Sequence, residues 1–217
     1  IPLVSLRANP EQKLKDDDEI IQEVETHNKA DLLLFSNKQT VYKVRIYEIN
    51  DSKASGLGEY LPNLLQREED ERIIYLVATD NYRGFMLFSF ENGKIAKIDL
   101  ASYATKTNRR KLANAYSGLS PLVSIMFLED DTELVAYSSI NKVLVFNTLN
   151  ISLKTTRDSQ GVQVLKSKKG STLTAIKRIE EPGIRDLDYY RTKNIPAVGC
   201  YLRDEDIKEK QIVLDFE

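Results

Sequence analysis

The sequence has very few of the residues that disulfides, metal sites and membrane spans require. Its 217 residues include one cysteine, Cys200, and one histidine, His27. One cysteine cannot form a disulfide within the chain, and this pair alone leaves a zinc site short of ligands. No stretch approaches the roughly 18 consecutive apolar residues of a transmembrane helix. We therefore expect a fold held by packing alone, in a reducing cytoplasmic setting and without membrane contact.

A basic excess and phosphate-binding glycine motifs are also missing. The chain has 31 Lys and Arg against 33 Asp and Glu, a net charge of −2, whereas nucleic-acid-binding domains are usually basic. It contains neither a G-x-x-x-x-G-K-[ST] loop nor a G-x-G-x-x-G turn. The acidic run Asp16–Asp18 is predicted to be solvated rather than a metal site. Because residue 1 is isoleucine, we expect the chain to be cut from a longer protein.

What the sequence does contain is an internal repeat. Glu19–Ser36 and Arg72–Ser89 align over 18 residues without a gap, and eight positions are identical. A third copy, one residue shorter, spans Leu122–Ser138, and a more divergent fourth spans Leu173–Tyr190. The period is therefore about 50 residues, a length typical of propeller blades.

Each copy has the same order of apolar segments. In the first copy, Ile20–Val24 is followed by a polar turn and Leu32–Phe35, and we interpret these two segments as a hairpin. Another polar turn leads to a third strand in which the apolar residues Val41 and Val44 are three apart. A fourth apolar element closes the copies, at Tyr60–Leu65, Leu112–Tyr116 and Gly161–Leu165.

Four strands in each repeat predict an all-β, propeller-like disc of about four blades, with atypical terminal blades. Stacked sheets would bury both faces, which explains the nearly continuous apolar strands. The expected blades are 19–71, 72–121, 122–172 and 173–217, within a single domain that residues 1–18 lead into. Short helical turns are expected at Leu100–Tyr103 and around Glu205–Lys210.

The segments DLLLFSNKQTVYKVRIYEI, GLGEYLPNLL and ERIIYLVAT resemble the C-terminal domain of bacterial type IIA topoisomerase A subunits, those of DNA gyrase and topoisomerase IV. The resemblance covers roughly Asp18–Ile176. It implies a β-pinwheel, a disc whose blades exchange a strand, and binding of duplex DNA around the outer rim. It also implies an A-subunit dimer working with an ATPase B subunit. The catalytic tyrosine, ATP and Mg²⁺ would belong to other domains or subunits, so we expect no catalytic centre or cofactor in this domain.

The sequence departs from the gyrase pattern at one place. Gyrase-type members carry a glycine-rich basic box, Q-R-R-G-G-x-G, whereas the nearest stretch here, Thr105–Gly118, keeps paired arginines but lacks those glycines. Glycines would let the backbone approach a phosphate closely. Their absence favours bending of DNA, as in a topoisomerase IV-type domain, over full wrapping.

DNA binding without sequence readout needs cations placed along the phosphate path. The two densest clusters lie at 106–111 and 166–169, in or beside the long connections. Tyr60, Tyr103 and Tyr116 lie near basic residues and are candidates for stacking at the rim. The predicted DNA contacts are Lys43, Arg45, Lys94, Lys97, Lys106, Arg109, Arg110, Lys111, Arg157, Lys166, Lys168 and Lys169.

Two other functions remain open at this point. A propeller can serve as a protein-interaction module without DNA binding, and an acidic rim would favour that reading. A propeller hydrolase would need carboxylates on the innermost strands, which here look apolar. The acidic residues gather in turns and termini, as at Glu129–Asp131 and Asp204–Asp206, so a basic rim is compatible with a net charge near zero.

Overall fold

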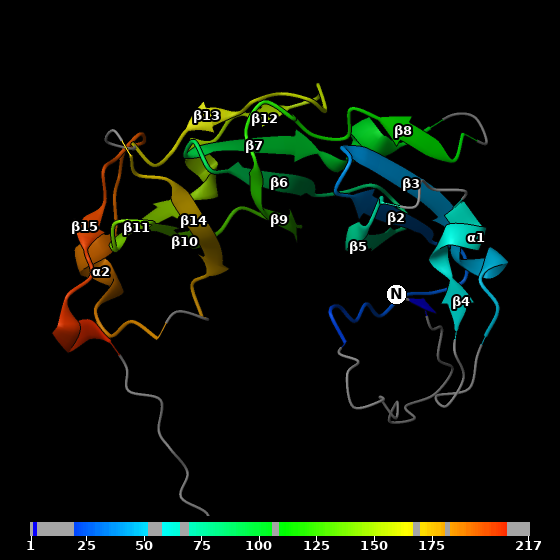
Figure 1. The fold of residues 1–217 in the computed structure, drawn as a ribbon, viewed down its shortest axis with the longest axis horizontal. Coiled ribbons are helices and arrows are strands. Elements are labelled where there is room, and N and C mark those ends of the chain that lie inside the picture. The colour runs from blue at the N-terminus through cyan, green and yellow to red at the C-terminus, as the bar shows by residue number, and fades with distance from the viewer. Residues whose placement is uncertain are drawn as a thin grey trace, which may run out of the picture. The chain divides into compact units, whose positions relative to one another are not determined.

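The computed structural model describes residues 2–3, 20–51, 58–65, 70–105, 109–166, 170–180 and 183–207. Most of the predicted lead-in, residues 1–18, lies outside these ranges. The chain forms two compact units (Figure 1). Unit 1 comprises Ile1–Arg83 and Tyr103–Tyr116, and unit 2 comprises Gly84–Ser102 and Ser117–Glu217.

Unit 1 contains one four-stranded sheet in the order β5-β2-β3-β8, and every neighbouring pair is antiparallel. A separate two-stranded sheet pairs β1 with β4, and the short helix α1 follows β4 directly. The strands are β1 (Pro2–Leu3), β2 (Asp31–Ser36), β3 (Thr40–Arg45), β4 (Glu59–Tyr60), β5 (Ile73–Thr79) and β8 (Lys111–Ala113), and the helices are η1 (Ile46–Glu48) and α1 (Leu61–Leu65).

Unit 2 contains two sheets. In the first, β9, β6 and β7 are antiparallel neighbours, and the free edge of β7 is covered by β13 and, in parallel, by β12. The second sheet has the order β14-β10-β11-β15. The first sheet is built from β6 (Phe85–Phe90), β7 (Lys94–Asp99), β9 (Leu122–Leu128), β12 (Leu153–Lys154) and β13 (Val162–Gln163). The second is built from β10 (Glu133–Ser138), β11 (Lys142–Asn147), β14 (Leu173–Arg178) and β15 (Cys200–Tyr201). The helices are η2 (Leu100–Tyr103), η3 (Thr148–Asn150), α2 (Leu187–Tyr190) and η4 (Asp204–Asp206).

The three larger sheets have the same plan. A central hairpin supplies the second and third strands: β2 and β3, β6 and β7, or β10 and β11. The strand beside the second strand comes from the next copy of the repeat: β5, β9 or β14. In the unit 1 sheet and the first sheet of unit 2, the outer strand comes from the connection after the third strand of that next copy. In the second sheet of unit 2 it is β15, which follows β14 and α2 with no further hairpin among the described residues. Each sheet is therefore completed by residues later in the chain.

This pairing corrects the predicted hairpins. The predicted turn between the second and third strands is confirmed. The prediction that the first and second strands of one copy pair as a hairpin is wrong. β5 pairs with β2 rather than with β6, and β9 pairs with β6 rather than with β10. Residues 173–207, expected to form a fourth blade, supply β14 and β15 to the second sheet of unit 2.

The three hairpin turns share one backbone feature. Gln39, Gly93 and Asn141 occupy the third turn position and have φ values of 52°, 78° and 57°. A three-residue hairpin loop needs a left-handed residue there, which glycine and asparagine adopt at low cost. These turns make the third strands equivalent, so Lys43 and Lys97 correspond to Val145.

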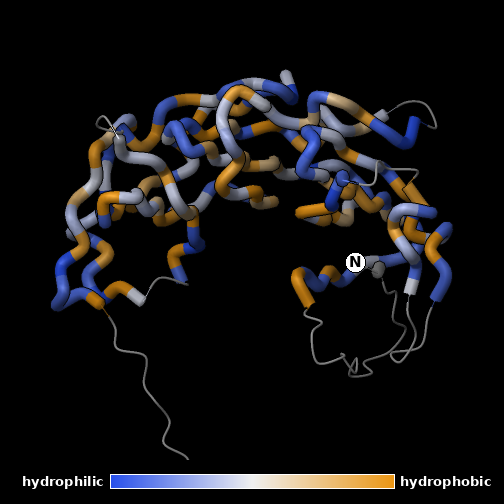
Figure 2. Tube along the Cα trace, in the orientation of Figure 1, coloured by the Kyte–Doolittle hydropathy of each residue, from blue (hydrophilic) through white to orange (hydrophobic). Residues whose placement is uncertain are grey.

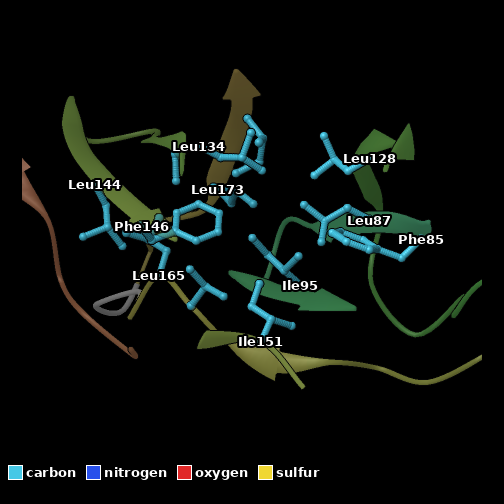
Figure 3. Close-up of a cluster of buried hydrophobic side chains, with 13 residues drawn as sticks. Phe85, Leu87, Ile95, Leu128, Leu134, Leu144, Phe146, Ile151, Leu165 and Leu173 are labelled. Atoms are coloured by element: carbon cyan, nitrogen blue, oxygen red, sulfur yellow. The ribbon is translucent and has the colours of Figure 1, made fainter. Parts of the chain in front are cut away.

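The core of unit 2 lies between its two sheets. Phe85, Leu87, Ile95 and Leu128 of the first sheet meet Leu134, Leu144, Phe146 and Leu173 of the second, and all of them are buried (Figure 3). The stacked sheets predicted from the apolar strands are therefore confirmed within this unit. Burial of apolar surface on this scale is the main stabilising contribution.

Short helices cover other sheet faces. In unit 1, Leu61 and Leu65 of α1 pack with Leu34 and Val44, and in unit 2 Tyr190 of α2 packs with Val145. Figure 2 shows the resulting alternation of hydrophobic strand segments and hydrophilic loops. The helical turn predicted at Leu100–Tyr103 is confirmed as η2. The one predicted around residues 205–210 is seen in part as η4, and residues 208–210 lie outside the described ranges.

Candidate nucleic-acid interface

The outer strand of unit 1 carries three consecutive exposed cations. Arg109 and Arg110 lead into β8, and Lys111 is its first residue. Arg110 is 63% exposed and contacts the Glu48 carboxylate at 3.1 Å. The Lys111 ammonium lies over the Tyr42 ring, 5.4 Å from its centroid. β8 is the edge strand of its sheet, so these three side chains lie along the solvent-facing edge of the sheet.

In unit 2, cations lie along the border formed by β12 and β13. Lys94 begins β7 beside β13, and its ammonium donates to the Gln160 side chain at 3.1 Å. Lys154 in β12 and Lys166 after β13 are exposed. These three lysines define the outer border of the first sheet of unit 2.

The second sheet of unit 2 repeats the pattern at β15. Lys142 is equivalent to Lys94 and is paired across the ladder with Tyr201. Its ammonium lies over the Tyr201 ring, 4.6 Å from the centroid, and Tyr201 is 63% exposed. Sequence reasoning did not select Tyr201, because β15 carries no repeat signature that would have marked it as an outer strand.

Lys43 and Lys97 were predicted to contact DNA, but both side chains are buried. The Lys97 side chain is 8% exposed, and its ammonium donates to Asp131 at 2.5 Å and lies 4.4 Å from the Phe85 ring centroid. The Lys43 side chain is 10% exposed, and its ammonium donates to the Thr105 hydroxyl at 2.5 Å. Neither ammonium can reach a phosphate without leaving the interior.

The remaining predicted cations have mixed environments. Arg45 ends β3, is half exposed and contacts Asp31 at 3.1 Å. Arg157 is partly buried and donates to the Ser102 carbonyl at 3.2 Å. Lys106, Lys168 and Lys169 lie outside the described residues.

Two of the three candidate tyrosines are internal. Tyr103 donates its hydroxyl to the Ala115 carbonyl, and Tyr116 donates to the Ser36 carbonyl, each at 2.7 Å. Burial is the main cause that raises the pKa of Tyr116. Only Tyr60, at 59% exposed, has the accessibility that stacking requires. The expectation for Tyr103 and Tyr116 was therefore wrong.

Several acidic residues are neutralised inside the fold. Burial alone would raise the pKa of Asp131, but hydrogen bonds from Lys97 and Thr148 outweigh it and hold the pKa below its usual value. Asp206 is 3% exposed, and hydrogen bonds from Arg203 and Tyr190 lower its pKa. Glu71 is also buried and accepts from the hydroxyls of Ser36 and Tyr42. Because Asp131 is paired with Lys97 and Asp206 with Arg203, these pairs leave the net charge unchanged, and the field at the outer borders depends on how the remaining charges are distributed.

Within the described ranges, no three His, Cys, Asp or Glu side chains are grouped so that they could hold a metal ion. Every helix in the same ranges is too short or too polar to cross a bilayer.

No protein-family model matches the chain, but it is similar in sequence to subunits of bacterial topoisomerases. It is 27% identical over 195 residues to the A subunit of DNA gyrase from Mycoplasma genitalium, covering 84% of this chain and 23% of that protein. It is 25% identical over 142 residues to the A subunit of DNA topoisomerase 4 from Staphylococcus aureus, covering 64% of this chain and 18% of that protein. The chain thus spans less than a quarter of the curated relatives it matches.

Solved structures agree on the fold. The C-terminal domain of DNA topoisomerase IV superposes with a TM-score of 0.68 at 23% identity, covering 80% of this chain and 55% of that one. The DNA gyrase A C-terminal domain gives 0.56 at 18% identity, covering 92% and 67%. The predicted resemblance is confirmed: the chain is similar in sequence to the A subunits of DNA gyrase and topoisomerase IV, and it has the all-β pinwheel fold of their C-terminal domains.

Proposed function

We propose that the chain is an accessory DNA-binding domain of a cytoplasmic type IIA topoisomerase A subunit, and that it bends duplex DNA along its outer sheet borders. The rest of the A-subunit dimer and an ATPase B subunit would carry out strand passage, with ATP and Mg²⁺ bound outside this domain. The observation that carries the proposal is the presence of exposed cations at the outer borders of the unit 1 sheet and of the first sheet of unit 2, with the half-buried Lys142 at the equivalent border of the second sheet of unit 2.

Physical chemistry supports this reading. Phosphate contacts from lysine and arginine provide most of the affinity for DNA that is independent of sequence, and each contact releases counterions. An arginine such as Arg109 can also bind a phosphate with two parallel hydrogen bonds. Among the described residues, Arg109 has no ion-pair partner, so its guanidinium is available.

Bending rather than wrapping is favoured by β8. This strand occupies the stretch that corresponds to the glycine-rich box, and it presents side chains instead of bare backbone. Contacts through long side chains keep DNA farther from the sheet than glycine backbone would.

The test is duplex binding measured by fluorescence anisotropy across a salt series. Arg109, Arg110 and Lys111 are changed together to Ala, and the matched control changes Lys29, Arg72 and Arg83, three exposed cations of unit 1 away from β8. We expect the edge variant to lose roughly tenfold or more in affinity, and its salt slope to fall by about 2 to 3, because each phosphate contact contributes about 0.9. The control should lose much less.

Equal losses in the two variants would show that β8 is not a specific contact surface. No binding by the unchanged protein, even at low salt, would favour the alternative of a protein-interaction module.

A further inference from the structure

The second sheet of unit 2 has two apolar faces, and both are covered. One face packs against the first sheet and belongs to the core between the two sheets. The other face carries Val135 of β10 with Val143 and Val145 of β11, and each of these side chains is 0% exposed. We call this surface the valine face. Because it points away from the first sheet, other residues must bury it.

The register of the strands shows what the same face does one sheet earlier. β6 pairs with β7 in the register in which β10 pairs with β11, so Leu87 is equivalent to Val135 and Ile95 to Val143. Leu87 and Ile95 belong to the core that joins the two sheets of unit 2. By its position in the repeat, the valine face is therefore a face on which a further sheet would stack.

A segment of a different kind occupies that place. Residues 184–207, which we call the cap, include α2, β15 and η4. Ile184 and Tyr190 are 4% and 2% exposed and pack with the valines, and α2 lies against β11 (Figure 1). The exposed side of the cap is rich in charged and polar side chains: Arg185, Asp186, Asp188, Arg191, Lys193, Asn194, Asp204 and Glu205. The cap thus presents a polar surface where the sheet alone would present an apolar one.

Side chains fasten the cap to the sheet and to itself. The Arg191 guanidinium donates to both carboxylate oxygens of Glu133 in β10, at 2.6 and 2.9 Å, an arrangement that is stronger than a single hydrogen bond. Inside the cap, the Tyr190 hydroxyl and the Arg203 guanidinium both donate to Asp206, each at 2.6 Å. Strand pairing adds little, because β15 pairs with β11 over only two residues.

We propose that the cap, fastened by Tyr190 and Arg191, masks a self-association surface, and that an uncovered valine face stacks on the valine face of a second copy of this chain. Proteins built from stacked repeats need terminal elements with a polar outer side to remain soluble. A second copy is the partner because it brings the same apolar face, and two-fold symmetry lets one patch meet itself. The proposal concerns the packing of sheets and does not depend on DNA binding.

The experiment opens the cap in the full chain. Tyr190→Asp places a second carboxylate beside Asp206 and removes the ring that covers the valines. Light scattering after size exclusion should give about twice the mass of one chain for this variant, and the mass of one chain for the unchanged protein. Hydrogen exchange should become fast in the cap while the amides of β10 and β11 stay protected, because the sheet itself remains folded.

Two controls separate a specific face from a general loss of stability. Phe146→Ala removes a buried side chain from the opposite face of the same sheet, which is destabilising, and this variant should stay monomeric. Adding Tyr137→Lys to Tyr190→Asp puts a lysine on the valine face of each copy. Since like charges would then meet across the interface, the double variant should return to the mass of one chain.

Arg191→Ala is a milder second variant, because it removes the contact with Glu133 without burying a charge. It should shift the mass in the same direction, and it replaces Tyr190→Asp if that protein does not fold. A monomer with a fast-exchanging cap and a protected sheet would overturn the proposal, since the valine face would be open without associating. Association of Phe146→Ala to the same extent, a dimer of the unchanged protein, or a cap that stays protected in both variants would each overturn it as well.

Discussion

The lysines inside the third strands and the cations at the outer borders have the same charge but opposite surroundings. Lys97 lies in the middle of β7, a strand covered on both faces. Its ammonium donates to Asp131 and lies over the Phe85 ring. Lys111 sits on an edge strand and keeps its ammonium at the surface over Tyr42.

The comparison shows that the place of a lysine in the ladder decides its role. An interior position demands a carboxylate or hydroxyl partner, since an unpaired buried charge is very costly. An edge position leaves the charge available to a phosphate. Counting basic residues along the sequence therefore overstates the number of cations that a phosphate could reach.

The largest effect is expected when a lysine is placed at an interior ladder position that has no carboxylate partner. Val145 is fully buried among apolar residues and is equivalent to Lys97. We expect Val145→Lys to destabilise unit 2 by about 3–5 kcal/mol, because the charge would be buried without a carboxylate. Urea unfolding checks this, with Val145→Met as the control. Equal stability of the two variants would contradict the idea that the position needs a charge partner.

Removing the interior lysine itself should have the next largest effect. Lys97→Met leaves Asp131 partly buried without its cation, which we expect to cost about 2–3 kcal/mol of unfolding free energy. The double variant Lys97→Met, Asp131→Val should recover much of this loss. Lys154→Met, at an exposed position, should change stability by less than about 0.5 kcal/mol. A loss of DNA affinity in folded Lys97→Met would show that Lys97 is a contact after all.

The outer border of unit 2 should show the reverse behaviour. Changing Lys94, Lys154 and Lys166 together to Ala should weaken duplex binding by roughly tenfold and reduce the salt slope by about 2, with little change in stability. Anisotropy titrations and thermal melts measure both quantities. In the control variant, Lys177, Arg185 and Lys193 are changed to Ala. These three cations are exposed elsewhere in unit 2, so the variant loses the same total charge. If the control weakens binding as much, the border has no special role.

The smallest expected effect is the pH dependence of the interior pair. Because the pKa of Asp131 is lowered in the folded state, its contribution to stability is fully present at neutral pH. It should be lost as the pH falls below the ordinary value of 3.8 toward the lowered value. Comparing acid unfolding of the unchanged protein and Lys97→Met isolates this contribution. Parallel acid profiles would show that Lys97 does not lower the pKa of Asp131.

The sequence predicted the strands well but not their partners. The repeat predicts strands at Ile73–Val77 and Phe85–Phe88, and the structure has strands over Ile73–Thr79 and Phe85–Phe90. A repeat cannot show where one unit ends and the next begins, since any starting point gives the same period. For that reason β5 and β6, adjacent in the chain, were wrongly predicted to form one hairpin although they belong to different sheets.

The candidate site was predicted in part, for a related reason. Arg109, Arg110 and Lys111 were recognisable as a dense cluster in a polar connection, and all three are exposed. Lys43 and Lys97 were misread because a lysine within a strand resembles an edge-protecting lysine. Before Lys43, the consecutive positions Val41 and Tyr42 are both apolar, and that signal marks a strand covered on both faces.

The exchange of outer strands also sets an order for synthesis. The sheet of unit 1 cannot close until Ala113 has left the ribosome, although its hairpin is complete at Arg45. During that interval the free edge of β3 is open to wrong partners, including the edges of neighbouring nascent chains. A pause in translation within the second repeat would prolong this exposure, whereas a pause after Ala113 would not.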